Sequence, residues 1–78
     1  MPSLFREMGL RFFFFSNEGN EPVHIHVENA GKYAKFWIKP VALVYNRGFN
    51  SIEIRKIKEI VFRSQMLIED KWNEYFSK

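Results

Sequence analysis

The pattern of apolar and polar residues is clearest between positions 23 and 38. Val23 to Glu28 alternates strictly between apolar and polar side chains, which is typical of a strand with one buried face. Asn29 to Lys32 contains turn residues, and the stretch up to Ile38 resumes as a returning strand. We therefore predict a β-hairpin whose two-residue loop is Ala30-Gly31.

This loop sets the cross-strand register of the hairpin. The predicted pairs are Glu28–Tyr33, Val27–Ala34, His26–Lys35, Ile25–Phe36 and His24–Trp37. One face is then wholly apolar: Val23, Ile25, Val27, Ala34, Phe36 and Ile38. The other is polar or amphipathic: His24, His26, Glu28, Tyr33, Lys35 and Trp37. A shift of one residue would mix the two sets, so we expect the apolar face to lie on the core and the second face to meet solvent.

Further elements flank this hairpin. The segment from Leu10 to Phe15 carries aromatic residues at both odd and even positions, which favours a strand buried on both faces. The polar segment from Ser16 to Pro22 is a predicted loop. Lys39-Pro40 interrupts the ladder, and Val41 to Tyr45 is a predicted additional strand.

A C-terminal helix is predicted from Asn50 onward. Asn50 suits the N-cap, and Glu53 stands where a capping box requires it. Apolar residues recur at spacings of three and four, and no Gly or Pro occurs from Ser51 to Lys78. We therefore expect one helix of about 25 residues, roughly 38 Å long.

Such a helix would extend beyond strands of about 20 Å. Its last turns carry Trp72, Tyr75 and Phe76, which need a covering surface. Two explanations stay open at this point. Either a homodimer forms through the C-terminal helix, or the segment with Leu4 and Phe5 folds back over these side chains.

These elements predict a single α+β domain over residues 1–78, with an antiparallel sheet of three or four strands packed against one long C-terminal helix. The expected core consists of Phe12, Phe14, Ile25, Val27, Phe36, Ile38, Leu43, Ile54, Ile57, Val61 and Ile68.

Composition narrows the class of protein. The chain is 46% hydrophobic and 18% aromatic, which excludes intrinsic disorder. It has no cysteine, so disulfides, thiolate zinc sites and a cysteine nucleophile are excluded. No apolar run reaches membrane-spanning length and no signal peptide is recognisable, so we expect a cytoplasmic protein without a membrane partner. The net charge of +3 is only mildly basic.

The two histidines form a His24-x-His26 pattern on the predicted strand. Residues two apart on a strand point to the same side, about 6.5–7 Å apart. Two imidazoles could act as the acid and the base in RNA cleavage by the RNA's own 2′-hydroxyl, a reaction that needs no cofactor. Lys35, opposite His26, would stabilise the developing charge, and Tyr33 and Trp37 would stack on bases.

Three other interpretations compete. His24, His26 and Glu28 could ligate a metal ion, although the Lys35 ammonium would lie close to that cation. The face could recognise a nucleic-acid strand or a peptide without chemistry. It could also be a solvated outer face with no further role. On the helix, Arg55 and Lys58 share a face that could contact phosphates, or be an ordinary solvated face.

The chain also resembles a known family. Arg11 to Glu18, the motif Glu21-Pro22-x-His24-x-His26-Val27, Gly48-Phe49 and the segment Lys71 to Phe76 resemble the small bacterial proteins classed as domain of unknown function 4160. Members usually carry Pro-Pro before the first histidine, whereas this chain has Val23 in the second position. The resemblance implies a setting like that of toxin–antitoxin pairs, with a small antitoxin-like partner protein, and gives more weight to the two histidines. By analogy with such toxins it also implies an RNA target.

Two hypotheses follow. The first is a toxin–antitoxin-type small protein that binds or cleaves RNA through the His-x-His face, as a metal-independent ribonuclease if it is an enzyme. The alternative is a non-enzymatic protein- or nucleic-acid-binding module that partners a second short protein.

Overall fold

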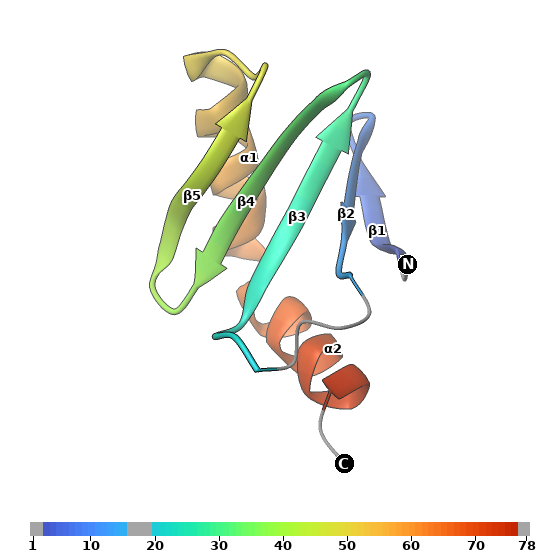
Figure 1. Ribbon diagram of the computed structural model, residues 1–78. Helices are drawn as coiled ribbons and strands as arrows, with labels where there is room; N and C mark the ends of the chain where they lie inside the picture. Colours follow the sequence, from blue (N-terminus) through green and yellow to red (C-terminus); the bar gives the residue numbers. More distant parts are fainter. Residues whose placement is uncertain (1–2, 16–19, 77–78) are drawn as a thin grey trace.

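The computed structural model describes residues 3–15 and 20–76, which form a five-stranded antiparallel sheet followed by two helices (Figure 1). The strands lie in the sheet in sequence order: β1 (Ser3–Glu7), β2 (Leu10–Phe13), β3 (His24–Asn29), β4 (Lys32–Ile38) and β5 (Val41–Arg47). The helices are α1 (Ser51–Arg63) and α2 (Gln65–Phe76). The α+β class is confirmed. The expected three or four strands and single helix are corrected to five strands and two helices.

The central hairpin of β3 and β4 has the register predicted from its alternation. Glu28 pairs with Tyr33, and all four further pairs down to His24–Trp37 are as expected. Ala30 and Gly31 form the loop with φ angles of 50° and 82°. Positive φ at both loop residues matches the right-handed twist of the flanking strands, which explains why this turn fixes the register.

The N-terminal strand β1 was not predicted. It pairs antiparallel with β2 through a turn at Met8-Gly9, where φ is 54° and 79°. Strand β2 ends at Phe13, two residues earlier than expected, yet Phe14 beyond it is still buried. The segments on either side of this turn are too short to show an alternating pattern of apolar and polar residues. Their pairing therefore could not be predicted from the sequence.

Helix α1 begins at the predicted cap. The Glu53 backbone N–H donates to Asn50 Oδ1 at 2.8 Å, and the Asn50 N–H donates to Glu53 Oε1 at 2.9 Å. The helix ends at Arg63, and α2 begins after Ser64. The Gln65 side chain donates to the Ile38 carbonyl at the end of β4 at 2.8 Å, so the break is tied to the sheet.

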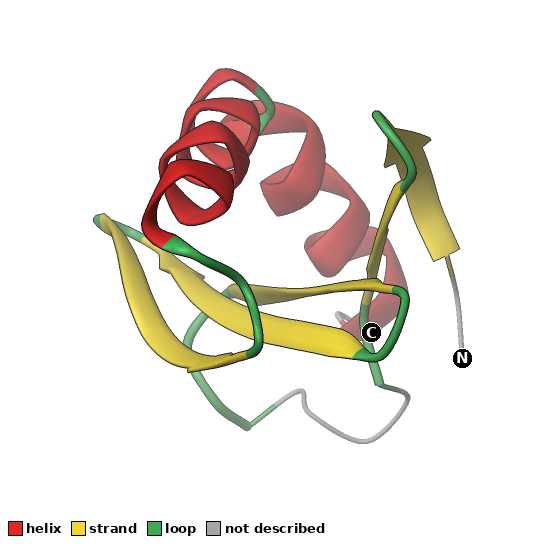
Figure 2. Ribbon diagram, turned by 90° about the horizontal axis from the view of Figure 1, so that it is seen from above, coloured by secondary structure: helices red, strands yellow, loops and turns green. Residues whose placement is uncertain are grey.

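Both helices lie on one side of the sheet (Figure 2). Helix α2 passes below the lower ends of the strands (Figure 1). The core fills the space between the layers: Leu10, Phe12, Phe14, Ile25, Val27, Ala34, Phe36, Ile38, Phe49, Ile57, Ile60, Val61, Ile68 and Trp72. Two expected core residues differ. Leu43 is 43% exposed because it lies on the edge strand β5, and Ile54 is only partly buried.

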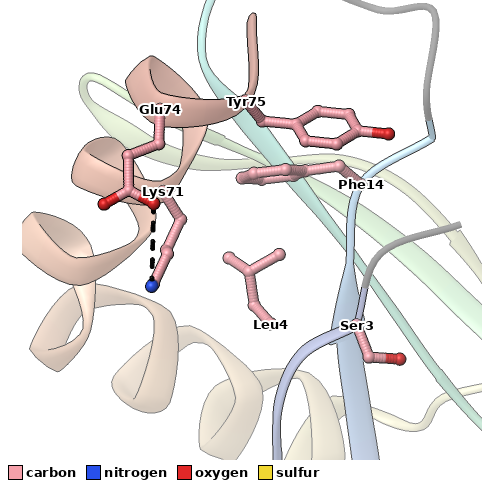
Figure 3. Close-up of a pocket in the computed structure, with 6 residues that line it drawn as sticks. All are labelled: Ser3, Leu4, Phe14, Lys71, Glu74 and Tyr75. Carbon is pink, nitrogen blue, oxygen red and sulfur yellow. Dashed lines mark ion pairs between the residues drawn. The ribbon is translucent and has the colours of Figure 1, made fainter.

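The C-terminal aromatic residues pack against their own chain. The Trp72 ring is 5.1 Å from the Phe14 ring at 84°, and Trp72 is only 5% exposed. Leu4 of β1 approaches the same end of α2 and leaves a pocket of about 260 Å³ there (Figure 3). Its lining residues are Ser3, Leu4, Phe14, Lys71, Glu74 and Tyr75. Burial of Trp72 therefore needs no second copy, while Tyr75 stays 41% exposed.

Candidate functional site

The two histidines lie on the same face of the sheet, as predicted, but they are buried. His24 is 0% exposed and His26 is 2% exposed. The expectation that this face meets solvent at the histidines is therefore wrong. Strand alternation assigns a side chain to a face correctly, but it does not show what other parts of the chain cover that face.

His24 is enclosed by aromatic rings from three elements. Its ring lies 5.0 Å from that of His26, 5.8 Å from that of Trp37 and 4.9 Å from that of Trp72 in α2. Its Nδ1 donates to the Pro22 carbonyl oxygen at 2.8 Å, because a carbonyl oxygen can only accept. The imidazole is thus held by packing and by the backbone just before β3.

His26 is covered from the side of β2. Phe13 stacks on its ring at 5.4 Å, and Phe15 meets it edge-on at 4.5 Å. His26 Nδ1 lies 2.6 Å from Tyr33 Oη, so the two side chains share a hydrogen bond. An acid–base catalyst must reach its substrate within hydrogen-bond distance. The burial of both rings does not give a substrate that access, so this geometry fits a structural role.

Lys35 lies opposite His26 in the sheet, as expected, but its charge is already matched. Its Nζ is 3.0 Å from Glu21 Oε1 and 5.0 Å from the centre of the Trp37 ring. The same Glu21 oxygen is 3.8 Å from His24 Nδ1. The start of β3 is thus covered by Lys35, Trp37 and Glu21. The Lys35 ammonium is already paired with a carboxylate and is not free to bind a ligand.

The metal interpretation finds little support. The Glu28 carboxylate of the proposed set with His24 and His26 forms an ion pair with Arg11 at 2.6 Å. Across residues 3–15 and 20–76, no three His, Asp or Glu side chains are grouped so as to hold a metal ion. The third proposed ligand is therefore engaged elsewhere in the sheet.

Arg55 and Lys58 do not join the residues of β3 and β4. Both are exposed on α1, the helix that packs on the apolar face of the sheet. Tyr33 and Trp37, the predicted base platform, are half-buried on the other face. The structure thus separates the two groups of predicted binding residues by the thickness of the sheet.

A different set of residues forms a continuous line across the outer face. In the register of the sheet, Arg6 lies opposite Arg11, Arg11 opposite Glu28, Glu28 opposite Tyr33, and Tyr33 opposite Arg47. Directly opposed residues of an antiparallel sheet point to the same face. These five residues, one from each strand, are called the arginine row below. The row carries three guanidinium groups and one carboxylate.

The arginine row borders a hollow of about 390 Å³ at the turn end of the sheet. Arg6 and Arg47 are exposed, and neither forms an ion pair with a carboxylate in the described part of the chain. The Arg47 guanidinium lies 5.7 Å from the centre of the Tyr33 ring. Two positive charges are thus available at this hollow, one at each end of the row.

Lys32 adds a fourth cation to the rim of the hollow, although it is already paired. Its Nζ lies 2.8 Å from Glu53 Oε2 at the start of α1. The hydrogen bond from Lys32, followed by that from the Asn50 backbone, lowers the pKa of Glu53 below its ordinary value of 4.5. This pair connects the hairpin turn to the helix cap and keeps the rim of the hollow in place.

The sequence contains a signal for this cluster, although no recognised motif includes it. Arg6 and Arg11 flank the Met8-Gly9 turn, Lys32 follows Gly31, and Arg47 precedes Gly48. In an antiparallel meander, alternate connections lie at the same end of the sheet. Basic residues beside alternate glycine turns therefore meet in space, even though each one looks like an ordinary surface residue in the sequence.

An exposed aromatic side chain completes the surface beside the hollow. Tyr45 pairs with Lys35 in the next outer line of residues, and it is 48% exposed. Its ring lies 5.8 Å from that of Tyr33. Cations and aromatic faces thus adjoin one another over β4 and β5.

Comparison with known proteins identifies the family. Residues 9–73 match the family model described as Domain of unknown function (DUF4160), and the chain belongs to that family. Neither the curated proteins nor the solved structures give a match. Within the described residues, neither helix combines the length and apolar character that crossing a membrane requires.

Proposed function

We propose that this DUF4160 protein binds single-stranded RNA on the outer face of its sheet, through the arginine row and the adjoining hollow, and does not cleave it. The observation that carries the proposal is the arginine row itself. Every strand contributes one residue to it, three of the five are arginines, and Arg6 and Arg47 have no ion-pair partner in the described chain.

The charges favour a phosphate ligand. Guanidinium groups match phosphate oxygens in a planar, bidentate geometry, and phosphate contacts supply most of the affinity in nucleic-acid binding. Among the residues that the structure describes, four cations border the hollow, and Glu28 is the only acidic residue that lines it. Its carboxylate is paired with Arg11 and so does not cancel the charges of Arg6 and Arg47.

The aromatic side chains favour a single strand over a duplex. Unstacked bases can lie on Tyr45 and on the accessible part of Tyr33, whose neighbour Arg47 would hold the backbone. The mild overall charge of +3 also suits a small single-stranded footprint.

The buried histidines support binding without cleavage. His26 shares its Nδ1 hydrogen bond with Tyr33, and His24 donates to the Pro22 carbonyl. We expect wild-type protein to leave a labelled mixed-sequence RNA intact in the presence of a chelator. Cleavage that is lost in a folded His26→Ala variant would reinstate the ribonuclease hypothesis.

Binding is tested by fluorescence anisotropy with a labelled single-stranded RNA of mixed sequence. We expect Arg6→Gln together with Arg47→Gln to weaken binding by about tenfold, because two phosphate contacts are lost. The slope of log affinity against log salt should become less steep by about 1.4, at about 0.7 for each contact in a single strand.

The matched control is Arg55→Gln together with Lys58→Gln, which removes the same charge from α1 on the other side of the sheet. We expect its affinity to stay within about twofold of wild type. Equal weakening by the two double variants would mean that only net charge matters, and the proposed site would be wrong.

A further inference from the structure

A small pocket lies at the turn end of the sheet, on the side of the helices, and is called the turn pocket below. It has a volume of about 230 Å³. Most of its lining is apolar: Met8, Leu10, Phe49, Ile52 and Ile57. Met8 and Ile52 are 64% and 73% exposed. Large apolar side chains that stay exposed around a cavity mark a candidate binding site.

The turn pocket adjoins the hollow beside the arginine row. The β1–β2 turn, the β3–β4 turn and the connection from β5 to α1 lie together at this end of the sheet (Figure 1). Asn29, the last residue of β3, lines both the hollow and the turn pocket. Met8 lines the turn pocket, and Gly9 of the same turn lines the hollow. A ligand held in the hollow can therefore extend past Asn29 into the turn pocket.

The two sites differ in charge. Among the described residues, four cations and one carboxylate line the hollow, whereas the turn pocket has one of each, Lys56 and Glu53. The hydrogen bond from Lys32 lowers the pKa of Glu53, so this carboxylate stays ionised at neutral pH. A phosphate in the turn pocket would be repelled by it, and a neutral ring would not. The hollow thus suits the backbone of a nucleic acid, and the turn pocket suits a base.

The volume of the turn pocket limits the size of its occupant. Sites for drug-sized ligands usually measure about 300–1,000 Å³. At about 230 Å³, the turn pocket is smaller than these sites. It therefore suits a single planar ring system rather than a whole nucleotide.

Asn29 is the polar residue between the two sites. Strand alternation points its side chain away from that of Glu28 and toward the helices. Its Nδ2 lies beside the β1–β2 turn, 3.9 Å from the position that a Cβ on Gly9 would take. The side chain is half-buried, and its carboxamide forms no hydrogen bond with any residue in the ranges 3–15 and 20–76. Both a donor and an acceptor are therefore available to a ligand.

One edge of adenine matches this carboxamide. Adenine presents its N6 amino group and its N7 acceptor side by side, and an asparagine side chain can pair with both. Guanine presents two acceptors, O6 and N7, on the same edge, so its O6 would face Asn29 Oδ1. A bidentate pair of this kind favours the right base over a wrong one by about fivefold or more.

We propose that the turn pocket takes one adenine base of the bound RNA, so that the protein prefers single strands that contain adenine. This inference rests on the proposed RNA-binding function and names the base that the site recognises. The phosphates lie along the arginine row, and the base turns past Asn29 into the turn pocket. There Asn29 Nδ2 donates to N7, Asn29 Oδ1 accepts from the N6 amino group, and Met8 and Ile52 pack on the ring.

The test compares three labelled seven-nucleotide RNAs by fluorescence anisotropy. One consists of uridine alone, one has a central adenosine, and one has a central guanosine. We expect the wild-type protein to bind the adenosine strand about fivefold more tightly than either of the others. Unlabelled adenosine monophosphate, added as a competitor, should displace the adenosine strand only at a far higher concentration, because it offers a single phosphate to the arginine row.

Variants separate recognition of the base from contacts with phosphate. Asn29→Ala should reduce the preference for adenosine to less than about twofold, while affinity for the uridine strand and the slope of log affinity against log salt stay unchanged. Arg6→Gln together with Arg47→Gln should weaken all three strands by the same factor and keep the preference. The matched control is Asn73→Ala, at an exposed asparagine of α2, which should behave as wild type.

Ile52→Ala provides a second test of the turn pocket. Ile52 is on the surface of α1, so its truncation removes contact area from the pocket without disturbing the core. We expect the preference for adenosine to fall from about fivefold to about twofold. This variant decides the question if Asn29→Ala fails to bind the uridine strand and so has not kept its fold.

The outcomes distinguish this inference from the proposed function. Equal binding of the three strands by the wild-type protein, or a preference that survives in both Asn29→Ala and Ile52→Ala, would overturn the inference alone. Adenosine monophosphate that binds as tightly as the adenosine strand would assign the turn pocket to a free nucleotide instead of RNA. Absence of binding to all three strands would overturn the proposed function, and this inference with it.

Discussion

His26 shows how the surroundings of a residue decide what its chemistry can do. The imidazole is stacked by Phe13, met edge-on by Phe15 and hydrogen-bonded to Tyr33. The alternation of β3 correctly predicted the face on which it lies. Its cover could not be predicted in the same way, because Phe13 and Phe15 come from another strand and its extension. The neighbouring His24 is covered by Trp72, 48 positions further along the chain.

We expect His26→Ala to lower the free energy of unfolding by about 2–4 kcal/mol, since it leaves a cavity under two phenyl rings and removes the partner of Tyr33 Oη. His26→Phe keeps the ring volume and should cost about 1 kcal/mol. Urea unfolding of both variants measures the difference. As a control, Lys58→Ala on exposed α1 should change stability by less than about 0.5 kcal/mol. A His26→Ala variant as stable as wild type would contradict the structural role.

The Lys32–Glu53 pair predicts a specific dependence on pH. Its hydrogen bonds lower the pKa of Glu53 from 4.5 in the folded state, so the ionised carboxylate favours folding. That contribution is fully present above pH 4.5 and is lost as the pH falls through the lower folded pKa. We expect Glu53→Gln, which keeps a capping oxygen, to be less stable than wild type at pH 6 and to approach it at pH 3.

Urea unfolding at pH 6, 4.5 and 3 measures this difference between the two proteins. Because the other carboxylates are common to both, their titration cancels in the comparison. A gap between wild type and Glu53→Gln that stays constant over this range would show that the Glu53 charge does not contribute to folding.

At the scale of elements, the sequence was sufficient to predict the structure wherever the residues that determine it are close together in the chain. The β3–β4 register follows from alternation and the Ala30-Gly31 turn, and the start of α1 follows from Asn50 and Glu53. The break at Ser64 has no comparable signal. It coincides with the Gln65 side chain donating to the Ile38 carbonyl, a contact with a residue 27 positions away.

The junction between β5 and α1 depends on Gly48. Its φ is 100°, and an added Cβ would lie 3.1 Å from Lys32 Cγ and 3.5 Å from Lys32 Cα. We expect Gly48→Ala to cost about 2 kcal/mol or more, because backbone strain and this close approach add together. Thermal or urea unfolding measures the loss.

Gly31→Ala provides the comparison, since Gly31 also has a positive φ, of 82°, but nothing lies within 4 Å of an added Cβ. Its expected cost is backbone strain alone, about 1 kcal/mol. If Gly31→Ala destabilised the protein as much as Gly48→Ala, the close approach of Gly48 to Lys32 would not be the reason for glycine at position 48.

At the scale of the whole molecule, the sheet and helices form two layers with different surfaces. The helix side buries the apolar core, and the outer side carries the arginine row. The class of fold could be predicted from the elements alone. The arginine row could not, because Arg6 and Arg47 are 41 positions apart and meet one surface only once the order of all five strands is known.

The composition of the arginine row has a thermodynamic consequence. Because every strand supplies one of its residues, no partly unfolded form that lacks an edge strand retains the whole site. A ligand that bridges Arg6 and Arg47 therefore binds only the fully assembled sheet, and its free energy of binding adds to that of folding. Under the proposed function, RNA would raise the melting temperature of the protein and slow hydrogen exchange in both edge strands together.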